Sequence, residues 1–197
     1  MIERPQVDTL LDLFAETGLL QFGDFDAGDG RRRPFLTRFE LLASYPDVLT
    51  ACVDAAEARV RAGAYVRLLC DVAALPFGVA LALRTGIPLV YSRGIGQPPV
   101  DDLVGAYDIG HKTLLVTTVL EGDLLALPWV HGARRVGLET AGVLTILDAR
   151  GGAAGGDVDA AALVHLTQAV DAYAAQGRLP VGQAAAVRAW LGLQSTP

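Results

Sequence analysis

The sequence predicts an α/β domain built on a mainly parallel sheet with helices on both faces. Apolar, β-branched runs of strand length alternate with helical segments along most of the chain, and glycine or proline marks the joins between them. The chain length also fits one such domain, because 197 residues with 52% hydrophobic content suffice for one well-filled core. A second independent domain is not expected at this length. We therefore expect a single domain over residues 1–197.

Local signals justify the first predicted elements. A leucine-rich stripe with helical spacing over residues 7–17 predicts a helix, and Gly18 ends it. Two apolar runs, 19–25 and 34–39, predict short strands on either side of a glycine-containing turn. Pro46 opens the next predicted helix, whose inner face carries small and apolar side chains.

The remaining elements alternate strand and helix. Short apolar runs predict strands, and segments with helical spacing predict helices. A glycine-rich linker over 151–156 precedes the two predicted closing helices. In chain order we expect a helix over 46–61, a strand over 66–72, a helix over 78–84, strands over 89–92, 113–120 and 141–147, and helices over 158–173 and 181–193.

Composition excludes several functional classes. A formal net charge of −6 and a pI near 5.0 oppose general nucleic-acid binding, and the local cluster Arg31–Arg33 is more often a solvated turn than a site. The N-terminus lacks the basic-then-apolar order of a signal peptide, and no apolar run reaches the roughly 18 residues of a membrane span. Cys52 and Cys70 lie in apolar surroundings without metal-site spacing, which indicates buried thiols in a reducing compartment. We expect a cytoplasmic protein that binds neither nucleic acid nor membrane.

The most informative segment is the apolar run 113–120 with the turn that follows it. The run predicts a buried strand, and in open α/β sheets ligands bind at the carboxyl ends of the strands. A phosphate-binding turn at that place needs small residues, hydroxyls and free backbone N–H groups. This turn carries Glu121 and Asp123 instead.

The order and spacing of these features resemble the orotate phosphoribosyltransferase family of type I phosphoribosyltransferases over nearly the whole chain. No single motif decides the resemblance, which rests on the common order of several. The matching segments are the opening helix and strand at 10–25, the turn Gly30–Arg31 with Pro34–Phe35, the helix start at 41–46, the strand at 87–93 and the linker at 173–180.

The resemblance implies a type I phosphoribosyltransferase-like fold, in which a mostly parallel five-stranded sheet is flanked by helices and carries a small N-terminal hood. It divides the single domain into an N-terminal helix and hood (1–40), an α/β core (41–150) and C-terminal helices (157–197). It also implies a homodimer, and a mean hydropathy of +0.37 agrees with burial at such an interface.

The family uses 5-phosphoribosyl 1-diphosphate (PRPP) with Mg²⁺, and this sequence departs from the family at the reacting centre. Two adjacent acidic residues of the family align with Thr117 and Thr118, which can bind a ribose hydroxyl but supply no charge to an oxocarbenium-like transition state. The 5′-phosphate turn aligns with Glu121, Gly122 and Asp123. Two like charges about 4 Å apart repel by roughly 4 kcal/mol at an effective dielectric near 20, so this turn is expected to oppose a phosphate.

Two other parts of the family site, the pyrophosphate-binding turn and the catalytic loop, match this sequence only in part. The pyrophosphate-binding turn aligns with Ala73 and Ala74, and it is weakened but retained because backbone N–H groups do the binding. Arg93 matches an arginine before the catalytic loop, but the loop lacks the family's lysines and histidine. The single lysine, Lys112, begins the next strand, and its neighbour His111 is expected to be a surface or capping residue.

Recognition of orotate requires a cation that faces the orotate carboxylate. Arg31 or Arg150 is the candidate, since Arg31 lies in the turn beside the implied orotate pocket with Phe35, and Arg150 is displaced by one residue from the arginine expected after Asp148. We assign no catalytic residue and no metal ligand. No cofactor is expected, and Mg²⁺ is expected only if PRPP binds.

Two interpretations of the departures remain open. β propensity alone can explain Thr117 and Thr118, and a solvated turn with helix-terminal charge can explain Glu121 and Asp123. We favour this structural explanation over a new chemical role for these four residues.

Two functional hypotheses remain, one for a binding or regulatory protein and one for an enzyme. The favoured hypothesis is a catalytically inactive or strongly impaired relative that binds a small nucleoside-like or cationic ligand, or regulates nucleotide metabolism as a paralogue of the true enzyme. The alternative is an active phosphoribosyltransferase that transfers ribose 5-phosphate from PRPP to orotate or another nucleobase.

Overall fold

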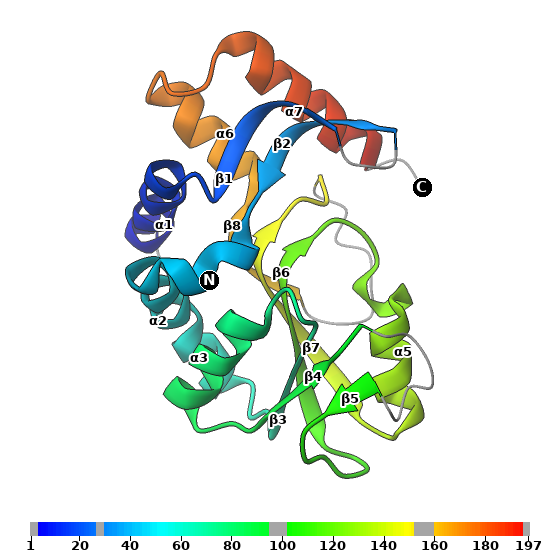
Figure 1. Cartoon of the computed structure of the whole chain (residues 1–197). Helices are drawn as coiled ribbons and strands as arrows, with labels where there is room; N and C mark the ends of the chain where they lie inside the picture. The colour runs from blue at the N-terminus through cyan, green and yellow to red at the C-terminus, as the bar shows by residue number, and fades with distance from the viewer. Residues whose placement is uncertain (1–3, 27–29, 95–101, 152–159, 195–197) are drawn as a thin grey trace.

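The computed structural model describes residues 4–26, 30–94, 102–151 and 160–194. A six-stranded sheet in the order β5-β4-β3-β6-β7-β8 forms its centre (Figure 1). The parallel strands are β3 (Arg67–Cys70), β4 (Leu89–Ser92), β6 (Lys112–Leu120), β7 (Glu139–Asp148) and β8 (Ala160–His165), and β5 (Leu103–Val104) is antiparallel to β4. The predicted mostly parallel sheet is confirmed, with five parallel strands and β5 added at one edge.

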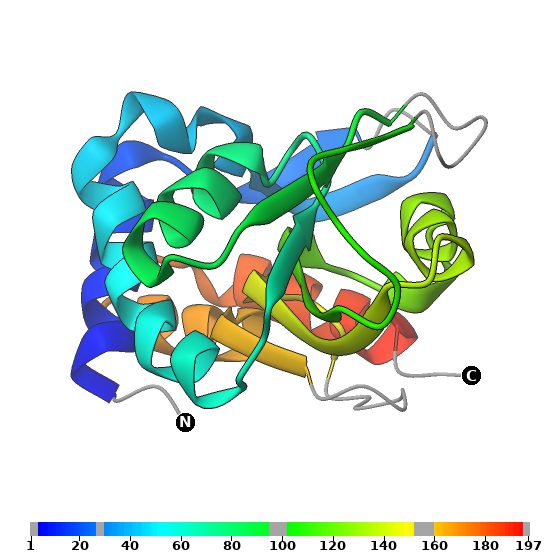
Figure 2. The same ribbon diagram turned by 90° about the horizontal axis from the view of Figure 1, so that it is seen from below.

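Helices cover both faces of this sheet. Seen from below, α1 (Arg4–Thr17), α2 (Pro46–Ala62) and α3 (Leu75–Thr85) lie on one side, and α5 (Pro128–Arg135) lies on the other (Figure 2). Because successive strand side chains point to opposite faces, Leu68 and Cys70 join the core under α1 to α3, whereas Leu69 joins the core under α5. Every one of these three side chains is fully buried.

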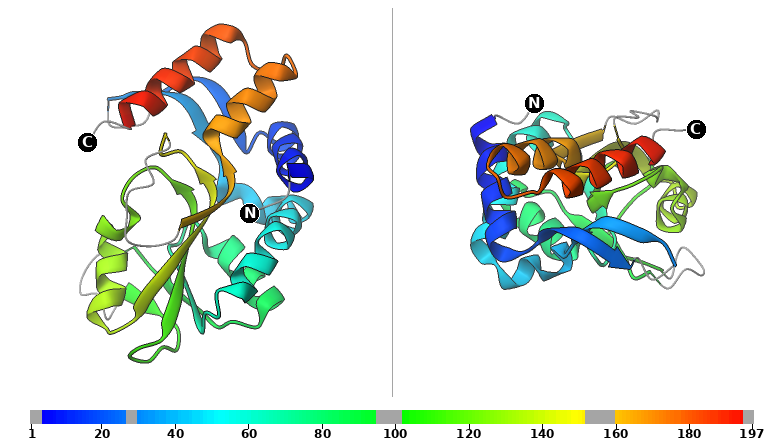
Figure 3. Two further views of the ribbon diagram at one scale, coloured as in Figure 1. Left: turned by 180° about the vertical axis from the view of Figure 1, so that it is seen from behind. Right: turned by 90° about the horizontal axis from the view of Figure 1, so that it is seen from above.

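A second layer lies across the carboxyl ends of the parallel strands (Figures 1 and 3). We call it the hood; it consists of the antiparallel pair β1 (Leu20–Asp26) and β2 (Arg32–Thr37) packed on α6 (Leu166–Ala175) and α7 (Val181–Gln194). The ring of Phe35 meets Trp190 edge-on at 5.0 Å, and Phe22 meets Tyr173 at 5.7 Å. The predicted N-terminal hood is therefore completed by the last two helices of the chain. The short helix η1 (Phe39–Ser44) leads from β2 into α2.

The main error of the sequence prediction concerns residues 158–173. The described part of this segment begins as a strand, β8, and only from Leu166 as the helix α6. Three successive alanines favour helix intrinsically, but β8 pairs with β7 from Val143↔Ala160 to Asp148↔His165, so the sheet overrides local propensity. The expectation of helices alone after residue 157 is corrected accordingly. The elements η2 (Leu124–Ala126) and α5 were not predicted.

Both cysteines are free and fully buried, as expected. Burial raises the pKa of the Cys52 thiol to about 12, and burial together with nearby Asp71 raises that of Cys70 to about 12. Neither is therefore an ionised nucleophile at neutral pH. Over the described ranges, each helix is too short or too polar to cross a membrane.

Candidate functional site

The candidate site lies where β3, β4, β6 and β7 end beneath the hood. The turns after these strands contain most of the residues selected from the sequence. Three carboxylates at this edge accept hydrogen bonds from donors of the same chain, and we call these interactions the carboxylate contacts. They are Asp71 with Ala74, Glu121 with Arg33, and Asp148 with Arg150.

The first carboxylate contact fills the predicted pyrophosphate turn. The backbone N–H of Ala74 donates to Asp71 Oδ1 at 2.8 Å. The backbone N–H of Ala73 also donates to the Asp71 carboxylate and lowers its pKa. Burial raises the pKa of the Asp71 carboxyl, although these backbone donors partly counteract the shift. The N–H groups expected to hold pyrophosphate therefore already have an internal acceptor at the start of α3.

The threonine pair lies inside β6 and faces little solvent. Thr117 is 5% exposed and Thr118 9% exposed. The hydroxyl of Thr117 bonds within its own strand, to the carbonyl oxygen of Val119 at 3.4 Å, and Thr117 lies opposite Thr145 of β7. This placement agrees with the structural interpretation of the pair as strand residues.

The second carboxylate contact joins the hood to the sheet. Arg33 of β2 donates from Nη1 to Glu121 Oε1 at 2.7 Å, with 37% and 30% of the two side chains exposed. The predicted charge at the phosphate turn must be corrected, because the carboxylate of Glu121 is compensated by an arginine that sequence reasoning had assigned to a solvated turn. Gly122 and Asp123 are exposed beside it, and Asp123 has a polar partner of its own.

The third carboxylate contact lies at the end of β7. Arg150 donates from Nε to Asp148 Oδ1 at 3.0 Å and from Nη2 to Oδ2 at 2.7 Å, and its backbone N–H also reaches Oδ1. His165 at the end of β8 adds its Nδ1 at 3.7 Å from Oδ2. Desolvation raises the pKa of Asp148, but the hydrogen bonds from Arg150 outweigh it and the net pKa is lowered. Arg150 is thus held by an internal carboxylate in the place proposed for orotate.

The other predicted site residues lie apart from these contacts. Arg93 is exposed at the end of β4, where the Ser92 hydroxyl hydrogen-bonds the buried Asp102 carboxylate. Arg31 is exposed directly before β2 and has an interaction partner. Phe35 is only 2% exposed and packs on Trp190, so its observed role is in the hood core.

Positive charge from lysine is absent from the described part of this edge. The single lysine, Lys112, lies at the opposite end of β6, where Nζ donates to the Gly63 carbonyl at 2.9 Å. His111 beside it is half-buried and accepts the Asp108 N–H at 3.0 Å within the turn that precedes β6.

Two residues of the site were missed from the sequence, Arg33 and Asp71. Position gave a usable signal for Asp71, because it lies at the end of the predicted strand 66–72 and precedes the aligned turn by two residues. Arg33 has no local signal, since its partner Glu121 is 88 residues away along the chain.

Mg²⁺ accompanies PRPP in the family, and this edge lacks the acidic pair that helps to organise it there. Mg²⁺ prefers carboxylate oxygens and substrate phosphates. Threonines replace the acidic pair, and the described residues contain no group of three or more histidine, cysteine, aspartate or glutamate side chains placed to hold a metal. We therefore derive no chemical step through a metal ion.

Comparison with known proteins defines the class. No family model matches the chain. Among solved structures, UMP synthase of Leishmania donovani aligns with a TM-score of 0.83 at 22% identity, over 95% of this chain and 42% of that chain. Orotate phosphoribosyltransferase of Mycobacterium tuberculosis in complex with PRPP aligns with a TM-score of 0.64 at 15% identity, over 85% and 93% of the two chains. The fold is that of a type I phosphoribosyltransferase.

Curated relatives with similar sequences are orotate phosphoribosyltransferases. Orotate phosphoribosyltransferase of Archaeoglobus fulgidus is 27% identical over 148 residues, which are 72% of this chain and 81% of the relative. Orotate phosphoribosyltransferase of Thermococcus kodakarensis is 29% identical over 151 residues, which are 74% and 82% of the two chains. The chain is therefore similar in sequence to orotate phosphoribosyltransferases over about three quarters of its length.

The lowered pKa of Asp148 predicts a specific acid sensitivity. A depressed carboxyl pKa contributes stability above the unfolded-state value, about 3.9, and this contribution is lost as pH falls through the folded-state pKa. We expect Asp148→Asn to lower the free energy of unfolding by about 1–3 kcal/mol at pH 7, and the difference from wild type to shrink below about pH 4. Urea unfolding of wild type and variant from pH 2.5 upward measures this difference in the free energy of unfolding.

The control is Asp12→Asn, which removes the exposed partner of Arg178 and should lower the free energy of unfolding by less. If the stability difference between Asp148→Asn and wild type stays constant over the whole pH range, the lowered pKa of Asp148 is contradicted.

Proposed function

We propose that this protein is a catalytically inactive or strongly impaired relative of orotate phosphoribosyltransferase that binds a small ligand or regulates nucleotide metabolism. The observation that supports it is the set of three carboxylate contacts, in which donors of the aligned pyrophosphate turn, the hood and the aligned orotate side all serve internal carboxylates. The same edge lacks an acidic pair at Thr117 and Thr118.

Charge balance supports the loss of activity. A PRPP site has to compensate several negative charges, and the arginines of this edge are partly compensated already. Hydrogen bonds to charged groups contribute about 1.5–3 kcal/mol each, so a substrate that displaces Asp148 from Arg150 has to offset a loss of that order. Threonine in place of the acidic pair then leaves the developing positive charge on the ribose without a counter-charge.

The same edge suits a ligand without phosphate. A neutral nucleoside leaves all three carboxylate contacts intact, and a small cation adds attraction to Glu121 or Asp123. Such binding needs no cofactor, and Mg²⁺ enters the proposal only together with PRPP. We place this role in the cytoplasm, which two buried, unpaired thiols support.

One observation favours the alternative of an active phosphoribosyltransferase with altered substrate. Arg33, Arg93 and Arg150 all lie at the carboxyl edge or reach it from the hood. An arginine released from its carboxylate presents five N–H donors, which suit a phosphate or a carboxylate. The two functions differ in whether PRPP can compete with the internal carboxylates.

An activity assay separates the two functions. We expect no conversion of orotate and PRPP to orotidine monophosphate above background, because the acidic pair and the loop cations are missing together. Thr117→Glu combined with Thr118→Asp should not restore turnover. The archaeal relative from Archaeoglobus fulgidus, assayed in parallel, is the positive control. Turnover within tenfold of ordinary enzyme rates, about 1–1,000 per second, would establish the alternative.

The phosphate turn provides a second test of the proposal. Calorimetry should find PRPP binding weaker than about 1 mM, with or without Mg²⁺. The double variant Glu121→Thr with Asp123→Gly should bind inorganic phosphate at least about tenfold better, because it removes repulsion and releases Arg33.

The matched control for the turn adds Arg33→Gln to that double variant. If Arg33 is the cation that phosphate then uses, the triple variant should lose most of the gain. Micromolar PRPP binding by the wild type, or unchanged phosphate binding by the double variant, would show that Glu121 and Asp123 do not control the site.

We also propose that the protein is a homodimer, and the exposed face of α3 supports this. Leu83 is 83% exposed and Val79 43% exposed beside a groove of about 440 Å³ between α2 and α3. Family resemblance favours a second copy as the occupant. Leu83→Glu should shift the sedimentation coefficient to that of a monomer at micromolar concentration, whereas Val181→Glu, at a site 87% exposed on α7, should not. A wild type that sediments as a monomer refutes the proposal.

A further inference from the structure

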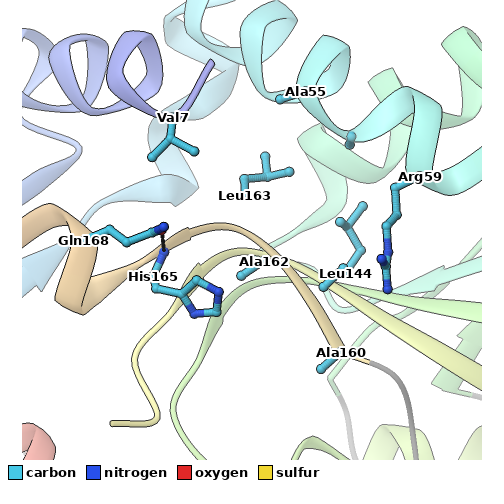
Figure 4. Close-up of a pocket in the computed structure, with 11 residues that line it drawn as sticks. Val7, Ala55, Arg59, Leu144, Ala160, Ala162, Leu163, His165 and Gln168 are labelled. Carbon is cyan, nitrogen blue, oxygen red and sulfur yellow. Dashed lines mark hydrogen bonds between the residues drawn. The ribbon is translucent and has the colours of Figure 1, made fainter. Parts of the chain in front are cut away.

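A cavity of about 250 Å³ lies at the β8 edge of the sheet, away from the turns of the candidate site (Figure 4). We call it the β8 pocket; α1, α2, β7, β8 and α6 all contribute to its walls. β8 is the last strand of the sheet, so the pocket opens beside a strand with a neighbour on one side only within the described sheet. It shares one residue with the surroundings of the site, His165.

Small side chains create this space. Ala55 and Ala56 of α2 line the pocket from one side, and residues 160–162 of β8 line it from the other, where Ala161 pairs with Leu144 on the face of the sheet that packs on α1 and α2. Protein interiors rarely keep voids larger than a water molecule, because bulkier side chains would gain packing contacts by filling them. A concave space with apolar walls and a few convergent polar groups is the usual form of a small-ligand site.

The polar groups of the pocket lie at two ends. Figure 4 shows Arg59 at one end, His165 with Gln168 at the other, and the apolar side chains of Leu144 and Leu163 between them. Gln168 Oε1 accepts the backbone N–H of His165 at 3.0 Å, which orients the amide. The amide nitrogen, with its two N–H groups, is then the donor that Gln168 can offer to a ligand.

We propose that the β8 pocket binds a small carboxylic acid with a compact apolar body. The guanidinium of Arg59 has five N–H donors and matches a carboxylate in a planar, bidentate arrangement. Leu144, Leu163 and the alanines contact the apolar body, and a hydrogen-bond acceptor at its far end meets the amide of Gln168. The apolar middle disfavours a free phosphate, which would need donors on all sides. This inference does not depend on the function proposed for the candidate site.

Benzoate and benzamide are the test probes, because they share an apolar ring and differ in charge. Titration followed by ¹H–¹⁵N correlation spectra should give a benzoate dissociation constant near 1 mM or below, with the largest shifts at residues 160–162 and Gln168. Benzamide should bind at least about tenfold more weakly. Inorganic phosphate should leave these signals unchanged.

Substitutions in the β8 pocket test whether benzoate binds there. Arg59→Gln should weaken benzoate at least about tenfold, whereas Arg188→Gln, which removes an exposed arginine of α7, should leave it unchanged. Ala161→Leu, at the residue that pairs with Leu144 on the pocket face of β8, should abolish binding by filling the space, with the melting temperature as the check that the protein remains folded. Equal binding of benzoate and benzamide, unchanged affinity in Arg59→Gln, or benzoate binding weaker than about 10 mM would each overturn the proposal.

Discussion

Compensation of carboxylate charge is the constraint on which this edge of the sheet depends. Parallel strands bring their carboxyl ends together, so Asp71, Glu121 and Asp148 are gathered at one edge by the topology alone. Each has its own donors: the start of α3, Arg33 of the hood, and Arg150. Without these donors, partly buried negative charges would carry a large desolvation cost.

The Arg33–Glu121 pair gives the hood a polar attachment to the sheet, in addition to apolar packing. The apolar packing of the hood is continuous with the main core, which contains Phe35 together with Leu68. Within the hood Phe35 packs against Trp190, and the Tyr173 hydroxyl donates to the Leu11 carbonyl of α1. The ion pair joins the hood to the turn after β6, at the edge where the candidate site lies. A ligand that keeps the pair intact meets no electrostatic penalty, whereas an anion competes with Glu121 for Arg33.

Several features of the fold were accessible from the sequence because they depend on short-range patterns. The strand at 89–92 and the helix that Pro46 opens were predicted within a residue or so, since apolar runs and helix-start signals are local. β8 was not, because its alanines favour helix and its strand form comes from pairing with β7. Thr117 and Thr118 lie in β6, inside the strand predicted over 113–120, for the same local reason.

The sequence by itself determined the class of fold, the family resemblance and the replacement of the acidic pair by threonines, all of which follow from residue order. Only the tertiary structure decided the electrostatics of the site. Arg33 meets Glu121 across 88 residues, and Arg150 turns back onto Asp148. Charge interactions depend on distance in space and on burial, and neither is recorded in the spacing of residues along the chain.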